Sequence, residues 1–225
     1  MKTLLALAIM LLGLTFASAQ TEQAPILEKE IKYKDWTYKS VRDDKPINLR
    51  EFAGNKKLVM VVYFAPWCPN WKHEAPFAQK LYEKYKASGF DVIGVGEYDT
   101  VAAMKTNLDQ FKITFPAVYE SDTQSAKQKT PHYEYRKAGG DARSWGSPWN
   151  IFLEPAKLTK KGDVLLEKTF VVNGELIEAE TEKFVREKLG LPAEEKKTDK
   201  TTSQTIEACE PEKKAVSFVK PEPKK

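Results

Sequence analysis

The feature that most constrains the fold is an apolar run at residues 57–65, KLVMVVYFA, which stops abruptly at Pro66. A nearly unbroken stretch of β-branched and aromatic residues is typical of a strand buried on both faces of a sheet. Beyond the turn the pattern becomes helical, with Phe77, Leu81 and Tyr85 at four-residue steps. The sequence therefore predicts a central strand that leads through a short turn into a helix.

Strand and helix patterns alternate after this unit. Residues 90–98 read as a second apolar strand, residues 100–113 as a helix and residues 115–120 as a short extended segment. This order predicts right-handed crossovers and a parallel core. Residues 35–52 precede the core as a predicted strand pair. Further strands and a closing helix are predicted at residues 149–154, 162–172 and 176–190.

The long polar segment at residues 121–148 is unusual for a simple connection. It carries two adjacent glycines and no apolar periodicity. Loops of this length are uncommon inside a domain unless they are functional or contain structure of their own. We expect it to hold a helix or a functional loop.

The start of the chain has the composition of a secretory signal peptide. Residues 1–19 combine a positive residue, an apolar stretch and small residues before a predicted cleavage site at Gln20. A membrane anchor would need about 20 apolar residues, which is more than this stretch offers. We therefore expect export to the periplasm or the extracellular space, with no membrane span after cleavage.

The end of the chain is dense in Lys, Glu, Pro and Thr, which predicts a disordered charged tail over residues 191–225. The remaining chain is expected to form a lead at residues 20–34 and a single domain at residues 35–190. The formal net charge of +4 is small and evenly spread, and it falls to +3 when Lys2 leaves with the signal peptide. This balance does not indicate a nucleic-acid partner.

Cys68 stands directly after the turn, at the expected start of the helix. Pro69 suits the first turn because its missing N–H would be unpaired there anyway. The free amides and the dipole of a helix start favour a thiolate, and Lys72 adds positive charge one turn on. These features predict a reactive thiol; the alternative is a buried cysteine that acts as a small apolar filler.

The string WCPNWKHEAP at residues 67–76, together with the order of elements, resembles the thioredoxin superfamily, and within it the exported TlpA-like thiol-disulfide oxidoreductases and their redoxin relatives. Those proteins typically show W-C-x-P-C followed by K/R-x-E-x-P in the same helix. The residues that match by position are Trp67, Cys68, Lys72, Glu74 and Pro76. The resemblance covers residues 36–189 and implies an α/β, thioredoxin-like three-layer sandwich with a mixed central sheet flanked by helices.

The resemblance also implies roles for individual residues. Cys68 would be the catalytic thiol, and Glu74 would tune or deprotonate it, although a helical wheel places Glu74 off the Cys68 face and an exposed glutamate is the alternative. GSPWNIFLE at residues 146–154 is similar to the family stretch whose proline is cis and faces the cysteine. Pro148 matches that proline, and Ser147 before it is a candidate substrate-binding residue.

Trp71 stands where the family has its second cysteine. The usual reaction, in which a partner thiol attacks the mixed disulfide, cannot occur inside this motif. Trp67 and Trp71 are candidate substrate-binding residues, with core packing an equal alternative for Trp71. Cys209 is a possible resolving cysteine, since 18 residues of coil from Leu191 span about 23–25 Å. The alternative is a tail cysteine without a role.

No cofactor or metal is expected. His73 and His132 are the only histidines and are predicted to lie on the surface. The glycines at residues 94–96 lack the spacing of a dinucleotide loop.

Three functions compete at this point. The favoured function is a monothiol disulfide oxidoreductase or isomerase that acts on protein or small-molecule thiols and disulfides through a mixed disulfide at Cys68. The second is a non-catalytic binding or chaperone-like module with an apolar surface formed by Trp67, Trp71 and Trp149. A thiol peroxidase ranks lowest, because Ala65 occupies the position where peroxiredoxins place a threonine.

Overall fold

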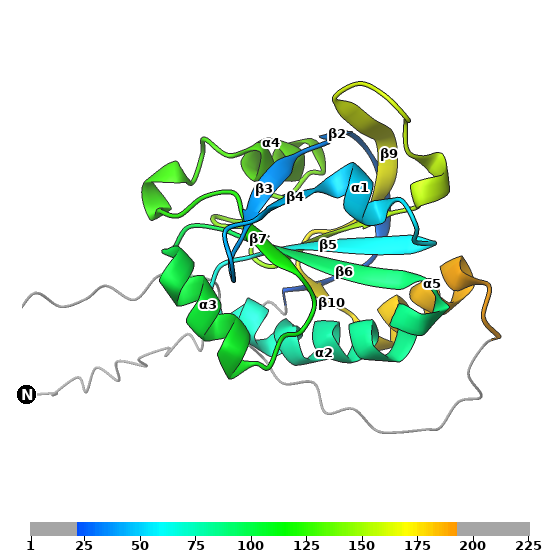
Figure 1. The fold of residues 1–225 in the computed structure, drawn as a ribbon, viewed down its shortest axis with the longest axis horizontal. Helices are drawn as coiled ribbons and strands as arrows, with labels where there is room; N and C mark the ends of the chain where they lie inside the picture. Colours follow the sequence, from blue (N-terminus) through cyan, green and yellow to red (C-terminus); the bar gives the residue numbers. More distant parts are fainter. Residues whose placement is uncertain (1–21, 193–225) are drawn as a thin grey trace, which may run out of the picture.

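The apolar run forms the centre of the molecule, as predicted. Strand β5 (Leu58–Phe64) is buried along its whole length and pairs in parallel with β6 (Phe90–Gly96) and antiparallel with β8 (Trp149–Leu153). A computed structural model describes residues 22–192, and in it β5 and β6 cross the middle of the fold (Figure 1). Strand β5 is apolar along its whole length because it has a neighbouring strand on each edge and helices over both faces of the sheet.

The main sheet has eight strands in the order β2-β9-β8-β5-β6-β7-β3-β4. Strands β5, β6 and β7 are parallel to one another, as the alternating pattern predicts. The bounds of the remaining strands are Leu27–Lys34 (β2), Thr37–Ser40 (β3), Pro46–Asn48 (β4), Ala117–Tyr119 (β7) and Val164–Val172 (β9). A second, two-stranded sheet joins β1 (Gln23–Ala24) in parallel to β10 (Glu175–Leu176).

Helices cover both faces of the main sheet (Figure 1). On one face α2 (Pro69–Tyr85), α3 (Val101–Gln110) and α5 (Glu178–Leu189) enclose one apolar cluster. On the other face α1 (Leu49–Ala53) and α4 (Pro131–Ala138) enclose a second cluster. Short 3-10 turns lie at Lys86–Ser88, Gln124–Ala126 and Pro155–Lys157. This arrangement confirms the predicted three-layer α/β fold, and the pairing of β3 with β4 confirms the predicted strand pair.

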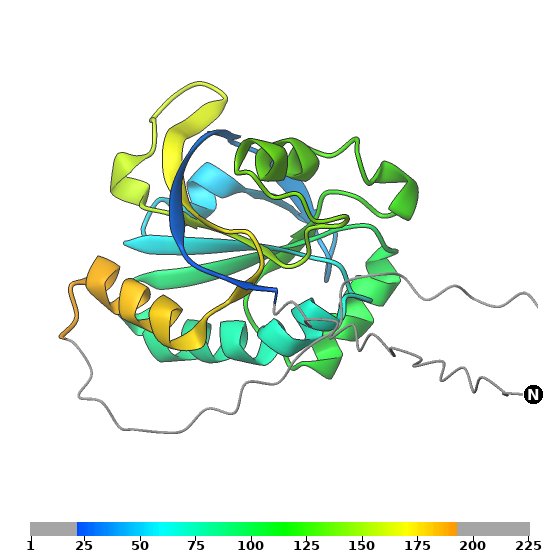
Figure 2. The same ribbon diagram turned by 180° about the vertical axis from the view of Figure 1, so that it is seen from behind.

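The predicted boundary between lead and domain at residue 35 is wrong. Strand β2 lies inside the predicted lead and pairs antiparallel with β9 along the edge of the sheet, where Figure 2 shows the two strands side by side. Its inward side chains, Ile31 and Tyr33, are buried in the core. The strand has only two buried apolar residues, and charged residues surround them. Its alternation of apolar and polar residues is therefore too weak to predict a strand.

The polar segment at residues 121–148 contains a helix, which is one of the two alternatives predicted for it. Helix α4 begins after Thr130, whose hydroxyl accepts a hydrogen bond from the amide of Tyr133. The segment then returns through Gly146, which has φ 60° and where a Cβ would lie 1.9 Å from Nη1 of Arg136. Only glycine satisfies both demands at this bend.

Two predictions fall outside the described residues: the signal peptide at 1–19 and the charged tail, including Cys209. Within residues 22–192, no helix combines the length and apolarity that a bilayer crossing requires.

Candidate active site

Cys68 occupies the head of α2. It is the N-cap residue, with Pro69 as the first helical residue, and its own amide donates to the carbonyl of Ala65 over 3.0 Å. The cysteine is 0% exposed and is disulfide-bonded. The Lys72 side chain is exposed, so solvent weakens the effect of its charge. The helix start is therefore the main local feature that favours negative charge on the sulfur.

A cis proline loop lies against Cys68. The peptide bond between Ser147 and Pro148 is cis, which the family resemblance implied. The sulfur of Cys68 lies 3.0 Å from the carbonyl oxygen of Ser147. A thiol at this position would donate a hydrogen bond to the carbonyl oxygen. A thiolate has no proton to donate and would be repelled by the lone pairs of that oxygen. The loop thus opposes the effect of the helix start on ionisation.

Ser147 is almost fully buried, and its hydroxyl accepts a hydrogen bond from the amide of Ala65 over 2.8 Å. Its side chain therefore fastens the loop to the end of β5. Substrate contact by Ser147 stays a prediction. Because the hydroxyl is already bonded to Ala65, such a contact would involve the main chain of Ser147.

Trp71 packs in the core, which is the alternative that the sequence left open, and its contact with substrate stays a prediction. The ring is completely buried, stacks obliquely on Phe64 at 4.8 Å between ring centroids, and donates through its indole N–H to Asn107 over 2.8 Å. Asn107 in turn donates to the carbonyl of Pro66 over 3.1 Å. Trp71 thereby ties α2 to α3 and to the turn before Cys68.

The predicted apolar recognition surface is also absent. Trp149 is fully buried, like Trp71, and only Trp67 of the three keeps accessible surface, with its ring edge-to-face with Trp145 at 5.1 Å. Within the described part of the chain, Leu27 is the only large apolar side chain classed as exposed. Ring-to-ring packing within the core explains why these aromatic residues cluster.

Glu74 is buried rather than exposed. Its side chain faces β8 and β10, where it accepts hydrogen bonds from the amide of Leu176 over 2.7 Å and from Asn150 over 3.1 and 3.2 Å. Burial raises the pKa of Glu74 to about 8, and these hydrogen bonds limit the rise. The carboxyl group can therefore change its protonation state near neutral pH.

His132 corrects the prediction of a surface histidine. It is completely buried, stacks on Tyr63 at 4.4 Å between ring centroids, and its Nδ1 lies 3.1 Å from the hydroxyl of Tyr98. Burial lowers the pKa of His132, so the ring stays neutral. His73 is exposed as predicted and pairs with Glu175 over 2.6 Å. No group of three or more ligating side chains suited to a metal ion occurs among residues 22–192.

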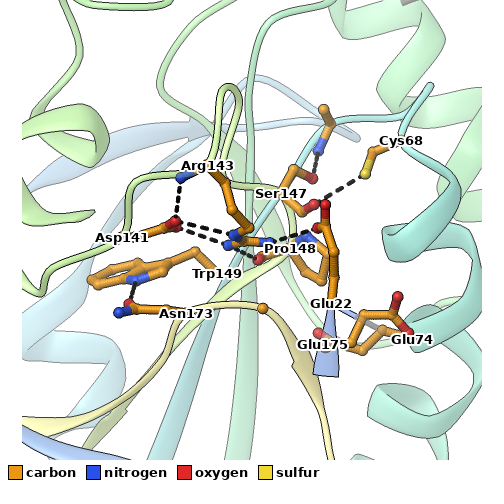
Figure 3. A network of polar contacts seen from close by, with 12 residues as sticks. Glu22, Cys68, Glu74, Asp141, Arg143, Ser147, Pro148, Trp149, Asn173 and Glu175 are labelled. Atoms are coloured by element: carbon orange, nitrogen blue, oxygen red, sulfur yellow. Dashed lines mark hydrogen bonds and ion pairs between the residues drawn. The ribbon is translucent and has the colours of Figure 1, made fainter. Parts of the chain in front are cut away.

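A charged network behind the proline loop was not predicted. Figure 3 shows Arg143 between Asp141, Glu22 and the backbone of Pro148, with dashed lines to all three. These residues come from a polar loop and from the chain start, and no periodicity marks them. An arginine two residues after an aspartate, just before the proline stretch, is the one sequence signal that could have pointed to them.

Comparisons with known proteins agree with this geometry. Residues 29–138 match the model of the AhpC/TSA family. A thiol-disulfide oxidoreductase ResA of Oceanobacillus iheyensis is 30% identical over 80 residues, which is 36% of this chain and 41% of that protein. The chain thus matches less than half the length of that curated relative.

Solved structures show the same fold. A thiol:disulfide interchange protein of the thioredoxin family from Chlorobium tepidum is 20% identical, with a TM-score of 0.51 over 72% of this chain and 98% of that chain. A thiol:disulfide interchange protein from Bacteroides sp. is 18% identical, with a TM-score of 0.50 over 76% of this chain and 93% of that chain. With a cysteine at the head of α2 and a cis proline against it, the chain has a thioredoxin-like fold and is similar, over part of its length, to the AhpC/TSA family and to thiol-disulfide oxidoreductases.

Proposed function

We propose that this protein is an exported thiol-disulfide oxidoreductase that forms a mixed disulfide at Cys68. The observation that carries the proposal is the position of a disulfide-bonded cysteine at a helix start, 3.0 Å from the carbonyl oxygen before a cis proline. A helix start stabilises a thiolate, and the disulfide of Cys68 supports a sulfur that can form S–S bonds in this fold. The expected reaction partners are protein or small-molecule thiols and disulfides.

The first step would be attack of the Cys68 thiolate on a substrate disulfide. A new S–S bond forms between Cys68 and one substrate sulfur, and the other substrate sulfur leaves as a thiolate that takes up a proton. A second thiolate must then attack the mixed disulfide. If that thiolate belongs to the protein, the substrate leaves fully reduced and the protein becomes oxidised by two electrons.

We assign that second thiol to Cys209. The chain has two cysteines, and Trp71 fills the motif position where a partner cysteine would lie. Helix α5 ends at Leu189, and the charged tail begins close to that point. Eighteen residues separate Leu191 from Cys209, and a linker whose span matches the distance to a site provides an effective concentration in the millimolar range. A Cys68–Cys209 disulfide would thus replace the usual disulfide within the motif.

Glu74 is proposed to hold or release a proton during these steps. Its pKa of about 8 keeps most of the carboxyl groups protonated at neutral pH while leaving a fraction ionised. The hydrogen bonds of Glu74 lead to β8 and β10, so its influence on Cys68 would pass through the proline loop and local water. The family resemblance and the unusual pKa support this role together.

The competing functions have less support. A binding module based on an aromatic surface loses its basis, because Trp71 and Trp149 are buried. A peroxidase would need a hydrogen-bonding side chain at Ala65, where the structure instead has a methyl group and an amide already bonded to Ser147. Export rests on residues 1–19, whose composition fits a cleaved secretory signal.

The decisive experiment compares three forms of the mature protein. Wild type, Cys68→Ser and Cys209→Ser are first reduced, then freed of reductant and incubated with a peptide disulfide, and adducts and released peptide thiols are measured by mass spectrometry. We expect Cys209→Ser to accumulate a mixed disulfide on Cys68 with release of one peptide thiol, wild type to release both peptide thiols in a single turnover and end as an internal disulfide, and Cys68→Ser to do neither. Undiminished release of peptide thiols by Cys68→Ser would refute the function, and release of both peptide thiols by Cys209→Ser would refute the role of Cys209.

A further inference from the structure

Arg143 makes a direct bond to the main chain of the proline loop. Its Nη2 donates to the carbonyl oxygen of Pro148 over 2.8 Å. On the other side of the same loop, Ser147 is fastened to Ala65 through its hydroxyl. The two attachments flank the cis peptide bond, so together they fix the position of the Ser147 carbonyl that contacts Cys68.

Asp141 holds the Arg143 side chain in a fixed orientation. Nε and Nη2 of Arg143 donate to the two carboxylate oxygens over 3.1 and 2.8 Å, and the Arg143 amide adds a third bond over 2.9 Å. The Asp141 side chain is only 1% exposed and also accepts from Arg136 over 3.1 Å. Although burial opposes ionisation, the bonds from Arg143 keep the pKa of Asp141 below its ordinary value.

Arg143 also reaches Glu22, just before β1. Its Nη1 donates to Glu22 over 3.0 Å, and the Glu22 carbonyl accepts from the amide of Glu175 over 2.8 Å. A Cβ at Gly174 would lie 1.9 Å from that carbonyl oxygen, so the close approach requires glycine there. One guanidinium thus joins three separate segments: the chain start, the loop after α4 and the proline loop.

The same cation lies near two buried carboxyl groups. Burial raises the pKa of Glu74 to about 8 and also raises the pKa of Glu175, while the charge of Arg143 lowers both. His73 on α2 pairs with Glu175 and acts in the same direction on that group. The charged groups that face this region are thus His73 and Glu74 from α2, Glu175 from β10, Glu22 from the chain start, Asp141 and Arg143 from the loop, and Arg136 from α4.

We propose that Arg143 is a positioning residue of the redox site, which holds the Pro148 carbonyl in place and supplies the positive charge beside Glu74 and Glu175. The inference rests on the proposed function, because it assigns Arg143 a part in disulfide exchange at Cys68. Its bond to Pro148 fixes the geometry, and its charge favours the ionised form of Glu74, in addition to the hydrogen bonds from Leu176 and Asn150. Neither role needs contact with the substrate.

The test uses two substitutions of Arg143 and one matched control. Arg143→Met removes the charge and every side-chain bond, whereas Arg143→Lys keeps the charge but cannot reproduce the fork. The control is Arg50→Met, since Arg50 likewise pairs with a carboxylate, on Asp35, and donates to main-chain carbonyls, on Thr159 and Gly162. All three are made in the mature protein with Cys209→Ser, so that one thiol reports on the site.

Two readouts separate the roles. The first is the rate constant for formation of the mixed disulfide with a peptide disulfide, which we expect to fall on the order of 10-fold in both Arg143 variants, as small misplacements of reacting groups do. The second is the titration midpoint of the Glu74 carboxyl, followed by carbon NMR and assigned with Glu74→Gln. We expect it to move upward in Arg143→Met and to stay near the wild-type value in Arg143→Lys.

Arg50→Met should change neither readout. The inference is overturned if Arg143→Met keeps both the wild-type rate constant and the wild-type Glu74 midpoint, or if Arg50→Met changes them as much. If the parent protein itself forms no mixed disulfide, the proposed function fails, but the Glu74 titration still tests the charge of Arg143. If Arg143→Met does not fold, Arg143→Lys still decides the positional role: an unchanged rate constant there would overturn it.

Discussion

Glu74 and Glu97 are two buried glutamates of the same domain whose surroundings differ. Glu74 accepts from a main-chain amide and from Asn150, and its pKa rises to about 8. Glu97, directly after β6, accepts from the Ser121 hydroxyl, while its Oε1 has no hydrogen-bond partner. Burial raises the pKa of Glu97 well above its ordinary value, and the neighbouring Glu120 adds to the rise.

The difference shows what determines how far the pKa of a buried carboxyl group rises. Both groups lose hydration to a similar degree, so burial alone does not separate them. An arginine charge favours the ionised form of each group, but Glu74 accepts from a main-chain amide and a side-chain amide, whereas Glu97 accepts from one hydroxyl and has the carboxyl group of Glu120 nearby. Glu74 can therefore exchange a proton near neutral pH, and Glu97 is held neutral as part of the core.

The largest expected effect comes from Glu97→Gln. A group whose folded pKa is raised stabilises the protein fully below its unfolded pKa, and this contribution is lost as pH rises toward the folded pKa. Because the pKa of Glu97 lies well above its ordinary value of 4.5, wild type should lose stability as the pH rises from about pH 5 toward the folded pKa. Glu97→Gln should remove that slope in urea unfolding at pH 5 to 9. A slope that persists unchanged in the variant would contradict the assignment.

Glu74→Gln should remove a smaller loss of folding stability, and this loss ends at a lower pH than the one caused by Glu97. With an ordinary pKa of 4.5 and a folded pKa of about 8, the lost stability amounts to about 5 kcal/mol between these pH values, at about 1.4 kcal/mol per pH unit. Above pH 8 the contribution is constant, because both states are ionised. The same urea series should show variant and wild type running parallel above this pH. If the two curves kept converging there, the two glutamates would not differ as described.

Asn150→Ala should raise the pKa of Glu74 further, so that Glu74 becomes more like Glu97 in its ionisation. The substitution removes the amide that donates to both oxygens of Glu74 and to the carbonyl of Gly174. We expect the Glu74 midpoint to move above about 8 and the unfolding free energy at pH 7 to fall by about 1–3 kcal/mol. Carbon NMR of the carboxyl group and urea unfolding measure the two effects. An unchanged midpoint would mean that the Leu176 amide alone sets it.

Local sequence patterns predicted the parts of the site that lie close together in the chain. The apolar run, the turn and the periodic helix placed Cys68 at the head of α2, and the family resemblance supplied the cis Pro148. The burial of Glu74 could not be predicted in this way, because β10, which covers it, lies about 100 residues further along the chain. A helical wheel reports on one helix and contains nothing about a later strand.

The arginine network was hidden for a similar reason. Arg143 lies in a polar segment with no periodicity, and apart from Asp141, two residues before it, its partners are Glu22 and the carbonyl of a proline. Strand β2 was missed because its two buried residues alternate with charged ones. In both cases important partners lie far away in sequence or belong to the main chain. Such partners cannot be recognised from the local amino-acid composition.

The pairing of β1 with β10 has a consequence for the timing of assembly. Glu22 comes near the beginning of the chain and Glu175 near the end of the ordered domain, yet they share a main-chain bond beside the redox site. Contacts of such high sequence separation form late, since almost the whole chain must be available first. During synthesis, Cys68 is therefore present in the chain before residues 23–24 and β10 can meet. The parallel pair of β1 and β10 is complete only once the chain has been made as far as Leu176.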